Sequence, residues 1–128
     1  LIKSKNIQLL PPIGYFDFLV LMKRSKLIIT DSGGIQEEAT APEIRKPVLV
    51  TRLSTERPEA VETGFAKIVG TQKTTILNAT TQTLNTYPQL SQHSPYGEGD
   101  AAEKIVDIIK QTPNNIKTCT ERFNNIKI

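Results

Sequence analysis

Ser32, Gly33 and Gly34 are the residues whose types and spacing are best suited to holding an anion. The two glycines carry no Cβ, so a ligand can approach the backbone closely there. Asp31 and Ser32 are turn and N-cap residues, and a helix is expected from about Ile35. The unpaired N–H groups and partial positive charge at a helix N-terminus attract phosphate. This turn is therefore a candidate phosphate-binding site.

The alternative interpretation of the turn is an ordinary strand-to-helix connection that Ser32 caps and that binds nothing. Many such turns contain glycine, and this pattern is shorter than a dinucleotide-binding fingerprint or a P-loop. No Gly-Lys-Ser/Thr sequence accompanies it, which argues against a Walker-type nucleotide triphosphatase. The local pattern alone leaves both interpretations of the turn open.

Glu37 and Glu38 follow the glycines and are expected in the first turn of the helix. A carboxylate in that turn is favoured by the helix dipole. One helical turn beyond a phosphate is also a suitable distance for a ribose, so one carboxylate could accept hydrogen bonds from sugar hydroxyls. The alternative for both residues is a solvated helix start.

Arg57 belongs to a charged loop, residues 55–59, that follows a predicted buried strand at residues 47–51. Ligands of open α/β sheets bind outside the carboxyl ends of the strands, so Arg57 is placed to bind a phosphate bidentately. The alternative is a surface ion pair with Glu56 or Glu59, which is the more common fate of such clusters.

Phe18 lies in a predicted helix, residues 15–24, slightly away from its strongest apolar face. One interpretation is a second core contact, which burial statistics favour. The other is a wall for a flat ligand such as a nucleobase. The apolar face itself consists of Phe16, Leu19, Val20 and Met22.

Short apolar runs alternate with helical patterns, which favours an α/β fold with a parallel sheet. About four strands are visible, fewer than in a complete doubly wound domain, so the chain is expected to be part of a larger protein. The strand at residues 27–30 is expected to be covered on both faces. The predicted strands are residues 7–10, 27–30, 47–51 and 65–69, and the predicted helices are about 15–24, 35–41, 73–84 and 101–111.

The composition describes a globular chain of 128 residues with 38% hydrophobic residues, 23% charged residues and a net charge of +3. Lys117, Arg122, Glu121 and Lys127 give the polar tail two of those three charges, so no basic face for nucleic acid is evident. No apolar run approaches the ~20 residues that span a bilayer. One Cys and one His cannot build a zinc cluster, and a reducing, cytoplasmic location is expected.

Five motifs occur in an order that strongly resembles the C-terminal part of the non-hydrolysing UDP-N-acetylglucosamine 2-epimerases. The resemblance covers roughly residues 7–109, and the ordered set is far more specific than the glycine turn alone. The motifs are Asp31-Ser-Gly-Gly-Ile-Gln-Glu-Glu-Ala39, Lys46-Pro-Val-Leu-Val50, Thr55-Glu-Arg-Pro-Glu-Ala-Val61, Val69-Gly-Thr71 and Ser94-Pro-Tyr-Gly-Glu-Gly99.

The resemblance implies a GT-B fold, in which two Rossmann-like domains close over a sugar nucleotide. Residues 1–111 would be an incomplete C-terminal UDP-binding domain, followed by a polar tail at residues 112–128. By position in the motifs, Phe18 would contact the uracil, Glu38 the ribose hydroxyls and Arg57 the phosphates or the closing cleft. The residues that would bind the diphosphate are Ser32, Gly33 and Gly34.

The reaction that the resemblance implies interconverts UDP-GlcNAc and UDP-ManNAc without a cofactor. Its acid and base groups would lie outside these residues, so the chain is expected to contain no catalytic residue and to be inactive alone. The resemblance also implies a homodimer for the whole enzyme. A hydrolysing epimerase, a GT-B glycosyltransferase fragment and a non-catalytic nucleotide-binding module remain alternatives.

One segment departs from the family pattern. Between Ala39 and Lys46 the chain reads Thr-Ala-Pro-Glu-Ile-Arg, where the usual segment is shorter and has a glycine before the lysine. Because this loop follows the phosphate-binding helix, the departure is expected to affect packing more than ligand contacts.

Overall fold

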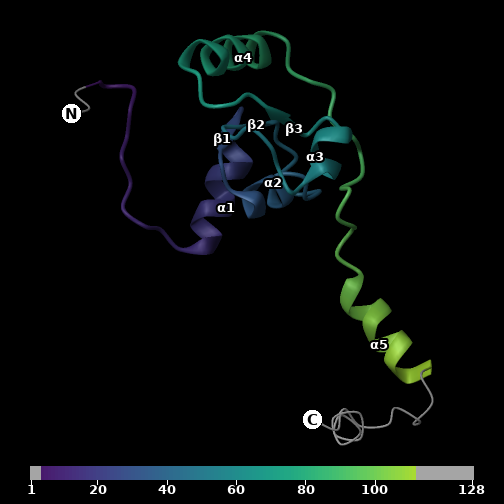
Figure 1. Ribbon diagram of the computed structural model, residues 1–128. Coiled ribbons are helices and arrows are strands. Elements are labelled where there is room, and N and C mark those ends of the chain that lie inside the picture. The colour runs from purple at the N-terminus through teal and green to yellow at the C-terminus, as the bar shows by residue number, and fades with distance from the viewer. Residues whose placement is uncertain (1–3, 112–128) are drawn as a thin grey trace, which may run out of the picture. The chain divides into compact units, whose positions relative to one another are not determined.

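The structure, a computed structural model, describes residues 4–111 (Figure 1). The chain divides into two compact units, Leu1–Tyr96 and Gly97–Ile128, and each is described by itself. The predicted polar tail at residues 112–128 lies outside the described residues.

The first unit is built on a three-stranded parallel sheet in the order β1-β2-β3. In the register, Ile29 pairs with Leu49, which pairs with Lys67. The predicted parallel α/β sheet is therefore confirmed, with each strand shorter than expected. The strands are β1 (Ile28–Thr30), β2 (Val48–Val50) and β3 (Ala66–Ile68).

Helices lie on both faces of this sheet, with α4 on one side and α1 and α2 on the other (Figure 1). The central strand β2 is wholly buried, and its residues alternate between the two faces. Val48 and Val50 pack with Met22 of α1, whereas Leu49 packs with Ala79 of α4. The helices of this unit are α1 (Tyr15–Arg24), α2 (Gly33–Glu38), α3 (Pro58–Glu62) and α4 (Lys73–Asn85).

Two strand predictions are wrong. Residues 7–10 form no strand, and Ile7, Leu9 and Leu10 are exposed; an apolar run becomes a strand only where a neighbouring strand can pair with it. β1, an edge strand, is not covered on both faces, because the side chain of Ile29 is 48% exposed.

The helix after the glycine turn begins earlier than predicted. Ser32 is its N-cap, so Gly33 and Gly34 form its first turn and the helix ends at Glu38. Glu37 and Glu38 consequently lie in the last turn, and the dipole argument for placing them in the first turn is wrong.

A short helix, α3, occupies part of the segment that was predicted to be a charged loop. It begins at Pro58, a residue suited to the first position of a helix because its missing N–H needs no partner there. Arg57 is the N-cap residue, so it marks the junction between the loop and the helix.

The loop between α2 and β2, which contains the segment that differs from the family pattern, is hydrogen-bonded to the segment that follows α4. Arg45 has a φ of 47°, and its guanidinium donates hydrogen bonds to the carbonyl oxygens of Leu90, Ser91 and Gln92. A glycine at this position would adopt the left-handed backbone without strain. The positive φ of Arg45 is unfavourable for a residue with a side chain, and the hydrogen bonds of its guanidinium offset this cost.

The second unit contains α5 (Ala101–Gln111), whose bounds match the prediction. Its apolar residues Ile105, Val106, Ile108 and Ile109 are exposed. Among the residues that the structure describes, no helix has both the length and the apolar character needed to cross a membrane.

Candidate functional site

The glycine turn is held by hydrogen bonds from both of its sides. The Ser32 N–H donates to Thr30 Oγ1 at 3.1 Å, which ties the turn to the end of β1. Ser32 Oγ in turn accepts from the Ile35 N–H at 3.5 Å and caps α2, as predicted. The first N–H groups of α2 are those of Gly33 and Gly34, which carry no side chain of their own, and Gly34 is exposed.

Arg57 lies directly beside this turn, although the two are far apart in the chain. A Cβ placed on Gly33 would lie 3.8 Å from Arg57 Cζ and 3.8 Å from Glu56 Oε2. The structure therefore brings together the glycine turn and Arg57, two features that the sequence assigned to one anion. A side chain longer than a methyl group at Gly33 would fill the space between them.

The Arg57 guanidinium forms its ion pair with Glu37 and not with Glu56 or Glu59, the two carboxylates that the sequence suggested. Its Nε donates to Glu37 Oε1, and its Nη1 donates to the backbone oxygen of Glu56 at 3.1 Å. Its side chain is 34% exposed, so part of the guanidinium still faces solvent. With Nε and Nη1 engaged in the protein, the N–H groups of Nη2 are the ones that could donate to a phosphate.

The carboxylate of Glu56 is engaged by Arg52. Arg52 Nη1 and Nη2 donate to Glu56 Oε2 and Oε1 at 2.9 and 2.7 Å, a bidentate pair. The hydrogen bond and charge of Arg52 lower the pKa of the Glu56 carboxyl, so it stays ionised. Because Arg52 balances this negative charge, Glu56 does not by itself make the neighbourhood of Gly33 anionic.

Two polar residues that sequence reasoning missed connect the turn to the Arg57 loop. Gln36 is wholly buried, donates to the Ser32 carbonyl oxygen and accepts from Thr55. Thr55 Oγ1 then accepts from the Arg57 N–H at 3.1 Å. The available signal was a polar side chain on an otherwise apolar face of α2, between Ile35 and Ala39.

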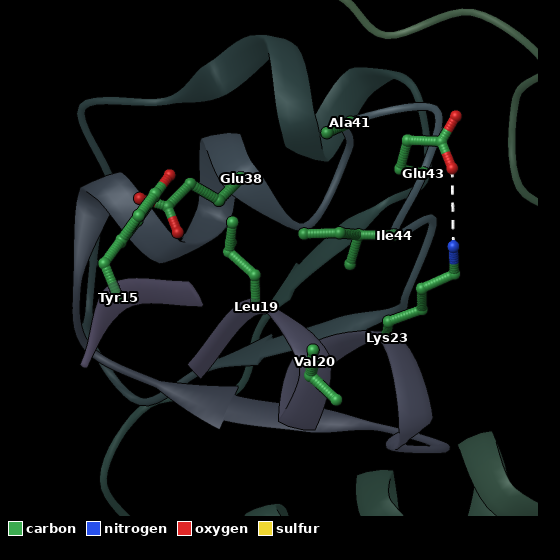
Figure 2. Close-up of a pocket in the computed structure, with 8 residues that line it drawn as sticks. All are labelled: Tyr15, Leu19, Val20, Lys23, Glu38, Ala41, Glu43 and Ile44. Carbon is green, nitrogen blue, oxygen red and sulfur yellow. Dashed lines mark hydrogen bonds and ion pairs between the residues drawn. The ribbon is translucent and has the colours of Figure 1, made fainter. Parts of the chain in front are cut away.

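Glu38 lies away from the turn, on the wall of a pocket of about 250 Å³. Figure 2 shows Glu38 and Tyr15 toward one end of this pocket and the Lys23–Glu43 ion pair, at 3.4 Å, toward the other. The side chains that line it are those of Tyr15, Leu19, Val20, Lys23, Glu38, Ala41, Glu43 and Ile44.

Phe18 is half-buried and packs against the core cluster that contains Met22, Val48 and Val50. This is the contact that the core interpretation anticipated, while the uracil contact stays a prediction. Within residues 4–111, no group of three or more His, Cys, Asp and Glu side chains could hold a metal ion.

Comparison with known proteins adds independent information. A relative from Campylobacter jejuni, called UDP-N-acetylglucosamine 2-epimerase, is 46% identical over 119 residues, which are 90% of this chain and 30% of that protein. The chain thus spans about 30% of the length of the curated relatives it matches.

Two solved structures are similar in both sequence and fold. The Neisseria meningitidis UDP-GlcNAc 2-epimerase bound to UDP-GlcNAc is 43% identical with a TM-score of 0.70, covering 84% of this chain and 30% of that one. The Staphylococcus aureus MnaA–UDP co-structure is 46% identical with a TM-score of 0.75 and the same two coverages.

These similarities agree with the predicted fold class, a Rossmann-like part of the C-terminal domain of a GT-B fold. A profile of the family described as UDP-N-acetylglucosamine 2-epimerase matches residues 1–110, nearly the whole described chain. The chain therefore belongs to the UDP-N-acetylglucosamine 2-epimerase family.

Proposed function

We propose that this chain is the UDP-binding part of an epimerase that interconverts UDP-GlcNAc and UDP-ManNAc. The observation that carries the proposal is the approach of the Arg57 guanidinium to Gly33 at the N-terminus of α2. Backbone N–H groups on one side and a guanidinium on the other form a suitable pair of partners for a diphosphate.

Each part of UDP, namely the diphosphate, the ribose and the uracil, has its own proposed partners in the chain. Ser32, Gly33 and Gly34 bind the diphosphate together with Arg57, and Glu38 accepts hydrogen bonds from the ribose hydroxyls. The support for this role is the place of Glu38 in α2, about one helical turn beyond Gly34, which is a suitable distance between a diphosphate and a ribose. Phe18 contacts the uracil with the exposed part of its side chain.

In the proposed reaction a base removes the C2 proton of the sugar while the C1–O bond to UDP breaks. The electron pair of the C–H bond forms the double bond of a 2-acetamidoglucal, and UDP departs with the electrons of the C1–O bond. UDP then adds back to C1, and a proton is delivered to the opposite face of C2. The present residues stabilise the negative charge of the departing UDP.

The proton-transfer groups must be positioned at C2, and the family resemblance implies that they belong to parts of the enzyme outside this chain. We therefore expect no UDP-ManNAc when the 128 residues alone are incubated with UDP-GlcNAc. The C. jejuni relative serves as the positive control in this assay. Turnover by the pure chain would contradict the assignment of a purely binding role. A cytoplasmic location and a homodimeric whole enzyme are part of the same proposal.

Calorimetric titration with UDP tests the site itself. Ser32→Phe is expected to abolish UDP binding, because the ring fills the space beside the first N–H groups of α2. Ser4→Phe, an exposed site in the N-terminal segment, is the matched control. Equal UDP affinity in Ser32→Phe and Ser4→Phe, with both variants folded by circular dichroism, would overturn the site assignment.

A further inference from the structure

We propose that Gln36 and Thr55 are positioning residues that set the separation between the glycine turn and Arg57. The proposal rests on the diphosphate site proposed above and adds the element that keeps its two sides in register. Neither side chain needs to touch the ligand. Both act through the backbone groups of Ser32 and Arg57.

The amide of Gln36 can adopt only one orientation in this arrangement. The Ser32 carbonyl oxygen only accepts, so the nitrogen Nε2 must face it, at 3.2 Å. The oxygen Oε1 therefore faces Thr55, and the Thr55 hydroxyl must donate to it, at 2.7 Å. The geometry thus fixes the amide without any choice between the two possible flips.

The Thr55 hydroxyl continues the same chain of hydrogen bonds. While its hydrogen is donated to Gln36, its oxygen accepts the Arg57 backbone N–H at 3.1 Å. An unbroken series of donors and acceptors thus runs from the Arg57 N–H to the Ser32 carbonyl. Such linked hydrogen bonds polarise and strengthen one another where water is excluded.

Burial makes this link hard to rearrange. Gln36 is 0% exposed, so its amide cannot turn toward water if Thr55 moves away. A buried amide left without its partner is unfavourable, and native proteins largely avoid it. The loop that carries Arg57 is consequently held at one distance from the turn.

This distance matters because the two sides would bind one diphosphate together. Sites of this kind need their groups held to within roughly half an ångström of the productive geometry. Loosening the link should weaken the diphosphate contact and leave the nucleoside contact unchanged. The expected signature is therefore a loss of the preference for UDP over uridine.

Calorimetric titration of the full chain with UDP and with uridine tests the proposal. Thr55→Val removes the hydroxyl at nearly constant volume and is expected to lower the UDP affinity roughly fivefold to tenfold, corresponding to one hydrogen bond. The uridine affinity should stay the same. Thr55→Ser keeps the hydroxyl and should restore the UDP affinity.

Thr63→Val is the matched control. The Thr63 hydroxyl donates to the Glu59 carbonyl oxygen at 2.7 Å, so the variant loses a comparable hydrogen bond outside the link. Gln36→Met removes the other half of the link and should reproduce the effect of Thr55→Val if it folds. Thr55→Val still decides the question if it does not.

The outcomes separate this proposal from the proposed function. If the unaltered chain binds UDP no better than uridine, both are overturned. If it prefers UDP and folded Thr55→Val keeps that preference, only the positioning role is overturned. An equal loss in Thr63→Val would also overturn it, because the effect would then be a general loss of stability. A selective loss in Thr55→Val that Thr55→Ser restores supports it.

Discussion

The loops on either side of β2 are both held by an arginine, but the two arginines hold different things. Before β2, Arg45 donates to three backbone carbonyl oxygens of residues 90–92, which fixes the path of a connecting segment. After β2, Arg57 is held by Glu37 of α2 and by Thr55, and Thr55 is linked to the glycine turn through Gln36. Only the second loop lies at the carboxyl end of the strand, where ligands of open α/β sheets bind.

The first arginine therefore holds a connecting segment, whereas the second belongs to the proposed ligand site. The buried Thr40 adds to the first set, since its hydroxyl lies 2.7 Å from Ser94 Oγ and holds the same segment. Both arginines are partly exposed, so they differ in their surroundings rather than in their burial. The groups that Arg45 and Thr40 contact belong to connecting segments, whereas Arg57 lies beside Gly33 at the N-terminus of α2. Affinity and stability should therefore respond to different arginines.

The largest effect is expected from Arg57→Ala. It removes a charged partner of the diphosphate, so the UDP affinity should fall by roughly 30- to 100-fold. Uridine affinity should change little, because uridine has no diphosphate. The urea midpoint should also change little, because ion pairs of partly exposed side chains contribute little to stability. Titration calorimetry with both ligands provides the measurement. Unchanged UDP affinity would contradict the assignment of Arg57 to the diphosphate site.

Arg45→Ala should have the converse effect. Loss of its hydrogen bonds to residues 90–92 is expected to lower the free energy of unfolding by about 2 kcal/mol. The UDP affinity of the folded protein should remain that of the unaltered chain. Urea denaturation measures the first quantity and calorimetry the second. A large loss of affinity with unchanged stability would show that this loop belongs to the site.

Arg45→Gly sharpens the same comparison, because it separates backbone strain from side-chain contacts. Glycine adopts the φ of 47° without strain, so this variant should be more stable than Arg45→Ala by about 1 kcal/mol. It should still be less stable than the unaltered chain. If both substitutions had the same effect, the left-handed backbone would carry no measurable strain.

The smallest effect concerns the Arg52–Glu56 pair beside the turn. Arg52 lowers the pKa of the Glu56 carboxyl, so the pair stabilises the protein above the unfolded pKa of that carboxyl. The contribution is lost as the pH falls through the lowered folded pKa. Glu56→Gln should therefore lower the melting temperature slightly at about pH 7 and not at about pH 2.

The exposed Glu62→Gln on α3 is the control for that experiment. A destabilisation in Glu56→Gln that stays the same at both pH values would contradict an electrostatic role for the pair. An identical pH dependence in Glu62→Gln would contradict its assignment to Glu56.

Features that depend on neighbouring residues could be predicted from the sequence. Residues 48–50 form a buried strand because a continuous apolar run has no polar side to expose. The bounds of α1 and α5 and the Ser32 cap also follow from local signals. The glycine turn could be identified because glycine is the residue that a close backbone approach requires.

Features that depend on distant partners could not be predicted. The apolar run at residues 7–10 resembles a strand, but pairing depends on a neighbour that the local pattern does not reveal. Thr55 lies 19 residues from Gln36, and Arg57 lies 20 residues from Glu37. No spacing rule links residues so far apart, so the contacts that complete the site became visible only in the fold.

Amide chemical-shift mapping of the chain with UDP, beside uridine, tests the central claim most directly. The account predicts that UDP shifts the backbone amides of Gly33 and Gly34 and the side-chain Nε–H of Arg57, and that uridine leaves these three signals in place. Shifts confined to α4, or the same shifts at Gly33 and Gly34 with both ligands, would contradict a diphosphate site between the glycine turn and Arg57.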